Sequence, residues 1–321
     1  MQPWKLSEPD QISEHRDRKP QLCAIPLISF SSESLVTDKN TLYNKPKSKN
    51  SGRIVPKGLF LFQTVHYTIN SPRIPAEFNG CRIAHLSDLH GALYGPDNRL
   101  LLNRIDEARP HLIAMTGDMA DEKDRAVPGF IDLCRRLVKR YPVYYITGNH
   151  EQSLSADVLS GLLSELRKMG IRILENNWTT ISRKGAFLKL YGLVTPMVYY
   201  KDPLGEYIKG IHFSAEDTEN ALGSFDNSCY TVLLSHNPLY YPSYRDWGAD
   251  LTLSGHIHGG IIRIPGLGGL LSPDLSLFPK YDGGLFEEEG KHLVVSRGLG
   301  NNFLVRVFNP PELVIIALQH S

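Results

Sequence analysis

Short apolar runs alternate with stretches of helical period over most of the chain. Runs of strand length, each bounded by polar or glycine-rich turns, occupy residues 82–87, 111–116, 143–147, 231–235 and 249–254. Apolar residues recur every three or four positions, as on an amphipathic helix, in residues 98–109, 128–141 and 155–170. The first part of the chain therefore predicts strands that alternate with helices.

The second part of the chain is richer in strands. Residues 171–182 and 186–194 predict a strand pair, whereas residues 259–284 hold so many glycines and prolines that we expect mostly loop. Residues 195–228 mix aromatic and polar side chains, a composition that suits either a partial lid over a substrate or a loop packed on the protein surface. Alternating strands and helices, followed by a strand-rich part, predict an α/β domain built in layers.

The N-terminal segment differs from the rest of the chain in composition. Residues 1–53 show neither period and are rich in Ser, Lys, Asn and Pro, so we predict a flexible arm there and a domain over residues 54–321. No stretch approaches the ~20 apolar residues of a membrane span. The apolar run at residues 22–30 is short, is interrupted by Pro26 and follows several acidic residues, which argues against a signal peptide. We therefore expect a cytoplasmic protein or one peripheral to the membrane.

Charge and cysteine content narrow the function classes. The formal net charge of the 321 residues is +1, so no global field favours nucleic acid, and we expect no nucleic-acid partner. The four cysteines lie far apart without a CxxC pair, which argues against a zinc finger and favours reduced structural thiols. Nothing in the composition indicates an oligomeric state.

Each of the five apolar runs first named ends in polar residues that are able to bind a metal ion or transfer a proton. These residues are Asp88, His90, Asp118, Asn149, His150, His236, His256 and His258. Because ligands collect beyond the carboxyl ends of strands in α/β sheets, we expect these ends to face one another. His256 and His258 would point the same way in an extended chain, since side chains alternate between its two faces.

Taken singly, these residues have ordinary structural interpretations. Asp88 suits a helix cap, Asn149 follows a glycine as turn residues do, and a lone His236 is typical of a satisfied core histidine. Taken together, so many polar groups at strand ends would be costly to bury, and metal ions are the simplest compensation. Imidazole and carboxylate ligands without thiolates suit Mn, Fe or catalytic Zn. The ligands outnumber what one ion needs, which favours two ions ~3.5–4 Å apart, the usual device for phosphoryl hydrolysis.

The ordered motifs Asp-x-His, Gly-Asp-x-x-Asp, Gly-Asn-His-Glu, His and Gly-His-x-His resemble those of the calcineurin-like metallophosphoesterases, over about residues 58–321. The flanking "SHNP", "GHIHGG", "PGLGGLLSP" and "VSRGLG" look like the bacterial branch that is often membrane-anchored or exported, some members of which hydrolyse UDP-diacylglucosamine. The N-terminal membrane helix or export signal of that branch is not evident here. The resemblance implies an α/β fold in four layers, α/β/β/α, with two mixed sheets flanked by helices.

The resemblance also implies roles for individual residues. Asp88, His90 and His258 would hold one divalent ion, and Asn149, His236 and His256 the other. Asp118 would bridge the two ions, which would share a hydroxide that attacks phosphorus. His150 would stabilise the transition state or protonate the leaving oxygen. Imidazole is suited to this proton transfer because it titrates near neutral pH. We expect manganese first, with iron and zinc as alternatives.

Several further residues have two interpretations each. Asp121 and Glu151 either orient metal ligands or are surface turn residues. Arg263, Lys280 and Arg297 are either phosphate contacts or solvated charges. The apolar loop over residues 261–286 either packs beneath the metal-binding loops or forms an exposed rim suited to a lipid-linked or membrane-proximal substrate.

The leading hypothesis is thus a metal-dependent hydrolase of a small phosphodiester or pyrophosphate, with a nucleotide-sugar lipid such as UDP-diacylglucosamine among the candidate substrates. One alternative is a non-catalytic metal-binding scaffold of the same fold, which has no need of His150. The other is a nuclease, which the near-zero net charge and the lack of a basic stripe with interleaved aromatic residues disfavour.

Overall fold

The computed structural model describes residues 62–121, 127–202, 204, 206–208, 210–260, 262–272, 276–300 and 306–321. The predicted arm, residues 1–53, lies outside the described residues, so the domain boundary stays a prediction. None of the helices in the described ranges is both long enough and apolar enough to cross a membrane.

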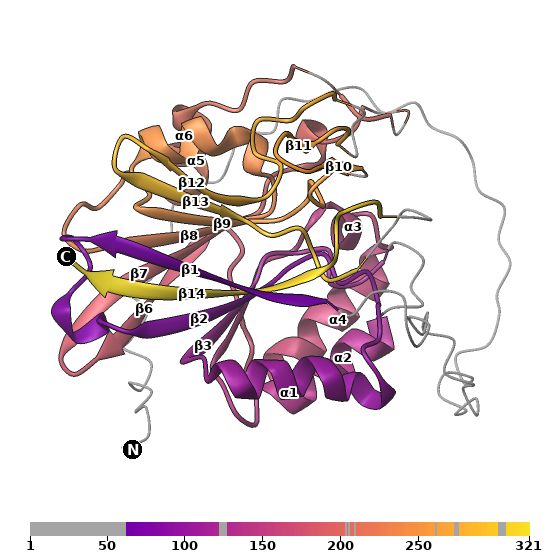
Figure 1. The fold of residues 1–321 in the computed structure, drawn as a ribbon, viewed down its shortest axis with the longest axis horizontal. Helices are drawn as coiled ribbons and strands as arrows, with labels where there is room; N and C mark the ends of the chain where they lie inside the picture. Colours follow the sequence, from indigo (N-terminus) through magenta and orange to yellow (C-terminus); the bar gives the residue numbers. More distant parts are fainter. Residues whose placement is uncertain are drawn as a thin grey trace, which may run out of the picture. The chain divides into compact units, whose positions relative to one another are not determined.

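Twelve of the strands form two six-stranded sheets (Figure 1). The first sheet has the order β1 (Gln63–Ser71), β14 (Glu312–His320), β2 (Cys81–Leu86), β3 (Leu112–Met115), β4 (Val143–Tyr145) and β5 (Arg172–Ile173). From β2 to β5 neighbouring strands are parallel, whereas β14 runs antiparallel to β2 and parallel to β1. The last strand of the chain is therefore inserted between the first two.

The second sheet has the order β12 (Gly284–Glu288), β13 (Lys291–Val295), β9 (Leu251–Ser254), β8 (Thr231–Ser235), β7 (Ala186–Leu193) and β6 (Asn177–Arg183). The four inner strands are parallel, and the two edge strands are antiparallel to their neighbours. A separate two-stranded ribbon joins β10 (Arg263–Ile264) to β11 (Gly268–Gly269).

Helices cover the outer face of each sheet. The helices α1 (Arg99–Ala108), α2 (Val127–Leu137) and α4 (Ala156–Lys168) pack on the first sheet, and α5 (Ala215–Leu222) and α6 (Tyr241–Trp247) pack on the second (Figure 1). Short helical turns complete the chain: η1 (Ala76–Phe78), η2 (Pro96–Asn98), α3 (Asn149–Gln152), η3 (Met197–Tyr199) and η4 (Pro238–Tyr240). The predicted four-layer α/β/β/α arrangement of two mixed sheets is confirmed.

The alternation of side chains along the strands explains the three cores. On β14, Leu313 and Ile315 face the helices of the first sheet, whereas Val314 and Ile316 face the second sheet. On β8, Val232 faces the first sheet while its neighbour Leu233 packs against α6. Both faces of the central strands are buried, which explains why the sequence shows them as continuous apolar runs.

One predicted element divides differently. The stretch 171–182 was expected to form one strand beside residues 186–194, but its two halves belong to different sheets. Residues 172–173 extend the first sheet as β5, and only β6 pairs with β7. Leu174 lies between them in the core that joins the two sheets, and its N–H donates to the Tyr145 carbonyl. Burial of Leu174 thus draws the first half of the stretch to the first sheet.

Candidate metal centre

The polar residues that end five strands of the two sheets meet at one place. Asp88 and His90 follow β2, Asp118 follows β3, Asn149 and His150 begin α3 after β4, His236 follows β8, and His256 and His258 follow β9. The strands β2, β3 and β4 are parallel to one another, as are β8 and β9, and all five point their carboxyl ends at this place. The expectation that these strand ends face one another is therefore confirmed.

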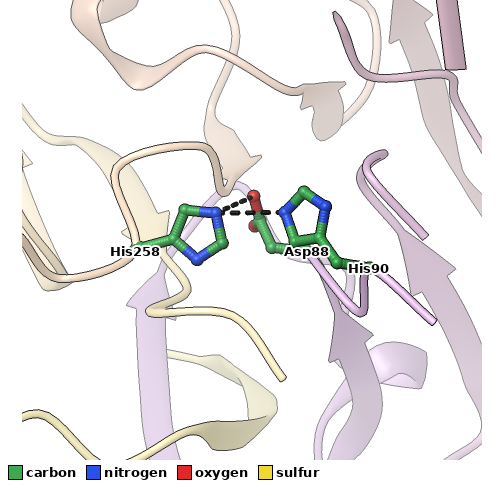
Figure 2. Close-up of side chains that lie close together, drawn as sticks. All are labelled: Asp88, His90 and His258. Atoms are coloured by element: carbon green, nitrogen blue, oxygen red, sulfur yellow. Dashed lines mark hydrogen bonds and ion pairs between the residues drawn. The ribbon is translucent and has the colours of Figure 1, made fainter. Parts of the chain in front are cut away.

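Asp88, His90 and His258 form the first group (Figure 2). The Nε2 atom of His258 lies 3.1 Å from Nε2 of His90 and 3.4 Å from Oδ1 of Asp88. The two imidazole rings are stacked, with ring centroids 5.0 Å apart. The Asp88 carboxylate also accepts the backbone N–H of His256 at 3.0 Å, which ties the β2 loop to the β9 loop.

Asp118 is the centre of the second group, which also includes His236 and His256. Its Oδ2 lies 3.1 Å from Nε2 of His236, and that nitrogen is also 3.1 Å from Oδ1 of Asn149. The other ring nitrogen of His236 lies 2.6 Å from the Thr116 carbonyl, which fixes the direction of the ring. The side chains of Asp118 and His236 are both almost fully buried.

His150 lies at the edge of this arrangement. Its Nε2 is 3.9 Å from Oδ2 of Asp118, and its Nδ1 is 3.9 Å from the half-buried Asp121. The His150 side chain is 13 % exposed, whereas those of His90 and His236 are 1 % exposed. His150 also forms a group of potential metal-binding atoms with His90 and Asp118. Its greater exposure places it where a bound molecule would meet the cluster.

The backbone at the site has an unusual conformation. Left-handed φ values between 45° and 68° occur at Asp88, His90, Asp118, His256 and His258. Non-glycine residues rarely adopt this conformation, and such strain gathers at functional sites because the surrounding structure must enforce it. His256 and His258 are therefore not in an extended chain, and the two rings belong to different groups of the cluster.

Two glycines allow the loops to approach. A Cβ atom at Gly148 would collide with the carboxylate and backbone nitrogen of Asp118, and one at Gly255 would collide with Ser87 and Asp88. Each glycine directly precedes residues of the cluster, in the "GNH" and "GHIH" motifs. The motifs therefore require glycine because the carboxylates of the opposite loops fill the space that a side chain would need.

Glu151 holds two of the loops together from beneath. Its carboxylate is fully buried and accepts the backbone N–H groups of Asp118 and Gly148 at 2.8 Å and of Ala120 at 2.9 Å. Of its two interpretations from sequence, a surface turn residue does not fit this burial. Glu151 instead sets the position of the Asp118 backbone relative to the turn that carries His150.

Buried charges of both signs shift one another's pKa values in the cluster. Burial opposes ionisation of Asp118, but His236 and His150 hold the pKa of this carboxyl well below its usual range. Burial raises the pKa of Asp88 to about 6, against the opposing effect of His236. Burial also raises the pKa of Glu151, and the Asp118 carboxylate adds to that effect. Burial opposes protonation of His236, but Asp118 raises the pKa of this histidine to about 9. Burial lowers the pKa of His90 to about 3, so it adds no charge near neutral pH.

The donor set suits divalent cations. The ligand atoms within each group, one from Asp88, His90 and His258 and the other from Asp118, His236 and His256, lie within 4.8 Å of one another. Nitrogen and carboxylate oxygen are the donors that Mn, Fe and catalytic Zn bind. Cations would also offset the negative charge of the buried Asp88 and Asp118 carboxylates.

Three predicted basic residues do not join the cluster. Arg263 pairs with Asp282 at 3.1 Å, exposed Lys280 pairs with Glu288 at 2.8 Å, and Arg297 binds the buried carboxylate of Glu312 through Nε at 2.7 Å. The structure gives each of them a carboxylate partner, so none extends an uncommitted charge toward the metal-binding groups.

Arg306 was not identified from the sequence, yet it lies directly against the cluster. Arg306 as a whole is 5 % exposed, and its Nη2 lies 3.0 Å from Nδ1 of His258. Its Nη1 donates to the Arg297 carbonyl at 2.7 Å. Since arginine only donates, Nδ1 of His258 accepts, and a cation at Nε2 would displace the proton of the neutral ring. The one available signal was a single arginine within an apolar stretch, "FLVRVF".

Comparison with known proteins identifies the fold and the chemistry. The family model of the calcineurin-like phosphoesterases matches residues 81–260. Among relatives, metallophosphoesterase YkuE of Bacillus subtilis is 29% identical over 268 residues, covering 81% of this chain and 87% of that protein. UDP-2,3-diacylglucosamine pyrophosphatase LpxG of Chlamydia trachomatis is 25% identical and covers 80% and 89%. Phosphodiesterase YaeI of Escherichia coli is 26% identical and covers 74% and 82%.

Proposed function

The chain belongs to the calcineurin-like phosphoesterases, which are hydrolases of phosphoric ester bonds, and we propose that it cleaves a small phosphodiester or pyrophosphate at a centre of two divalent cations. One observation carries the proposal. Five strand ends of two different sheets bring eight residues with metal-binding or proton-transferring side chains to a single buried place. Both sheets contribute side chains to this site. Strained backbone and buried charge both cost folding stability, so a need for stability does not explain why they are concentrated here.

The residues divide naturally between two cations. Asp88, His90 and His258 would hold one, and His236, His256 and Asn149 the other. Asp118 lies between them, 3.9 Å from Nε2 of His90 and 3.1 Å from Nε2 of His236, and would be shared. When bound, two such cations lower the pKa of a water molecule, so that it attacks phosphorus as hydroxide, and offset charge on the phosphate oxygens.

The protein's own side chains supply the remaining chemistry. The His150 side chain is partly exposed and its Nε2 lies near the shared carboxylate, so this nitrogen is placed to donate a proton to the leaving oxygen. Asp121, 3.9 Å from Nδ1 of His150, would keep the ring in the orientation that presents Nε2. Glu151 keeps Asp118 in place through its backbone.

The names of the relatives and the surface of the molecule support a lipid-linked nucleotide substrate. LpxG is named for the pyrophosphatase reaction on UDP-2,3-diacylglucosamine, and YaeI is named a phosphodiesterase. In the apolar loop over residues 261–286, Leu267, Leu277 and Phe278 are all more than half exposed. The exposed-rim interpretation of that loop therefore fits better than packing beneath the metal-binding loops. We propose UDP-2,3-diacylglucosamine as the first natural substrate to test.

The test combines metal content with turnover of bis-p-nitrophenyl phosphate, with manganese as the first metal. We expect about two ions per chain and measurable hydrolysis in the wild type. Asp118→Asn should lose both metal and activity. His150→Ala should keep the metal and lose activity by about 10²-fold or more, because a general acid contributes that much. His66→Ala, which changes an exposed histidine on β1, is the matched control.

Each alternative class makes a different prediction in the same experiment. A metal-binding scaffold would hold the ions while wild type and His150→Ala were equally inert with several metals, and that result would refute the proposal. A nuclease would cleave single-stranded DNA in a salt-sensitive manner and faster than the small diester.

A further inference from the structure

A cavity of about 310 Å³ lies beside the second group of the metal centre. His256 belongs both to the wall of this cavity and to the metal-binding group with Asp118 and His236. The remaining wall comes from residues 199–200, 207–208 and 210–213, from η4 with Asn237 before it and the start of α6, and from Ser276. A molecule that placed its phosphate on the metal centre could therefore extend a neighbouring group into this cavity.

The wall of the cavity is dominated by aromatic rings that are packed against one another. Tyr199 and Phe213 meet edge to face with centroids 4.9 Å apart, and Phe213 lies 5.3 Å from Tyr240. The Tyr240 hydroxyl donates to the Tyr199 carbonyl at 2.7 Å, which joins the two sides of the wall. Tyr200 lies next to His256, with centroids 5.1 Å apart. The rings are thus held in place before any ligand arrives.

The wall carries little charge. Among the described residues that line the cavity there is no Asp, Glu, Lys or Arg, and the titratable side chains are tyrosines and the two histidines His212 and His256. Asn237 also lines it, and because its Oδ1 accepts the Leu239 N–H at 3.0 Å, the polar group that this side chain has left to offer a ligand is its amide NH₂. The cavity therefore combines flat apolar surfaces with a neutral hydrogen-bond donor.

We propose that this cavity binds a neutral planar ring, joined to the scissile phosphate of the substrate by a short linker, such as a nucleobase or another aryl group. The proposal rests on the proposed function, since it takes the metal centre as the phosphate site. Aromatic side chains stack on planar rings, and the Asn237 amide suits a ring carbonyl. An acyl chain would fit less well, because it would cover this amide without offering a hydrogen-bond acceptor.

The size of the cavity agrees with one ring system rather than a whole substrate. Its volume of about 310 Å³ lies at the lower end of the ~300–1,000 Å³ typical of small-molecule pockets. The remainder of a larger substrate would have to leave the cavity. The exposed apolar side chains of the loop over residues 261–286 are a separate surface and are not required by this proposal.

The experiment measures equilibrium binding, by calorimetric titration, of four phosphate monoesters to the manganese-loaded protein: uridine 5′-monophosphate, phenyl phosphate, methyl phosphate and n-octyl phosphate. We expect both ring esters to bind at least about tenfold more tightly than methyl phosphate, in line with the stacking of one ring on aromatic side chains. A further gain for uridine 5′-monophosphate over phenyl phosphate identifies the ring as a nucleobase, and equal affinity identifies a plain aryl group.

Variants locate the effect. Tyr199→Leu and Tyr240→Leu, each of which removes one ring of the wall, should reduce the preference for ring esters over methyl phosphate about tenfold. Tyr199→Phe keeps the ring and should keep the preference. Phe187→Leu removes a ring that is 49 % exposed on β7 and should change nothing.

Two results would overturn the proposal: tighter binding of n-octyl phosphate than of either ring ester, or an unchanged ring preference in both leucine variants. Failure of the proposed function is recognised separately, because methyl phosphate would then show no metal-dependent binding and bis-p-nitrophenyl phosphate would not be hydrolysed.

Discussion

Replacement of Glu151 tests whether the proposed metal centre depends on a buried carboxylate that is not one of the proposed ligands. This side chain accepts three backbone N–H groups, from Asp118, Ala120 and Gly148, and it is fully buried. Glu151→Ala removes every acceptor at once. Glu151→Gln keeps one oxygen, which can still accept from Asp118 and Gly148, but turns an NH₂ group toward the N–H of Ala120.

The expected magnitudes follow from the number of donors that lose their acceptor. A buried N–H left without a partner costs about 1–3 kcal/mol, so Glu151→Ala should destabilise by about 3–5 kcal/mol when water partly replaces the carboxylate. Glu151→Gln leaves one donor unpaired, but it also removes a buried charge and its repulsion from Asp118, the two causes that raise the pKa of Glu151, so we expect a cost of about 1 kcal/mol.

Urea unfolding of each variant measures these differences, with the slope of the transition checked for constancy. Glu165→Ala is the matched control, because Glu165 on α4 is half-exposed and pairs only with Lys168 in the described structure. It should stay within about 0.5 kcal/mol of the wild type. A Glu151→Ala variant as stable as this control, with normal metal content, would show that the loops are held in some other way.

Three further changes test separate parts of the structure. Burial lowers the pKa of His85 to about 3, below its unfolded value of about 6.5, so the folded protein loses stability as the pH falls below 6.5. Between pH 7 and pH 5 the free energy of unfolding in urea should therefore fall by about 2 kcal/mol more in the wild type than in His85→Gln. In a metal titration, Arg306→Met should bind metal about tenfold or more weakly because the His258 ring loses its hydrogen bond, and Arg306→Lys should restore only part of the affinity. Equal metal affinity of Arg306→Met and the wild type would contradict this. Gly148→Ala should abolish metal binding because its Cβ would occupy the place of a carboxylate, whereas Gly161→Ala, with open space around it on α4, should bind metal normally in the same assay.

The sequence was sufficient for the five strands that carry the cluster and for the helices α1, α2 and α4, because these depend on local pattern. Buried parallel strands appear as apolar runs, and polar residues directly after such runs are carried to the same edge of a sheet. Asp88, Asp118 and His236 could be placed together on that ground alone, before any coordinate was known. The order of the strands within each sheet was less accessible, since β14 joins β1 and β2 across almost the whole length of the domain.

What the sequence could not show depends on partners that are distant along the chain. Arg297 looked available for a phosphate, but Glu312 faces it once β14 is in place. Arg306 was not identified from the sequence, and only the fold brings it to His258. The aromatic cavity is equally non-local, because Tyr199 and Tyr240 are 41 residues apart along the chain and their ring centroids lie 5.9 Å apart in the fold.

The same non-local contacts make the site a property of the packed sheets rather than of any one loop. The backbone N–H of His90 donates to the Asp118 carbonyl at 3.0 Å within the first sheet's loops, and Gly255 donates to the His236 carbonyl at 3.1 Å within the second's. Leu299, after β13 of the second sheet, donates to Ser87 at the end of β2 at 3.0 Å. The two sets of ligands are therefore brought together only when the sheets are packed against each other. Cations that bind only this arrangement must stabilise it by mass action, so metal binding and the packing of the two sheets are coupled.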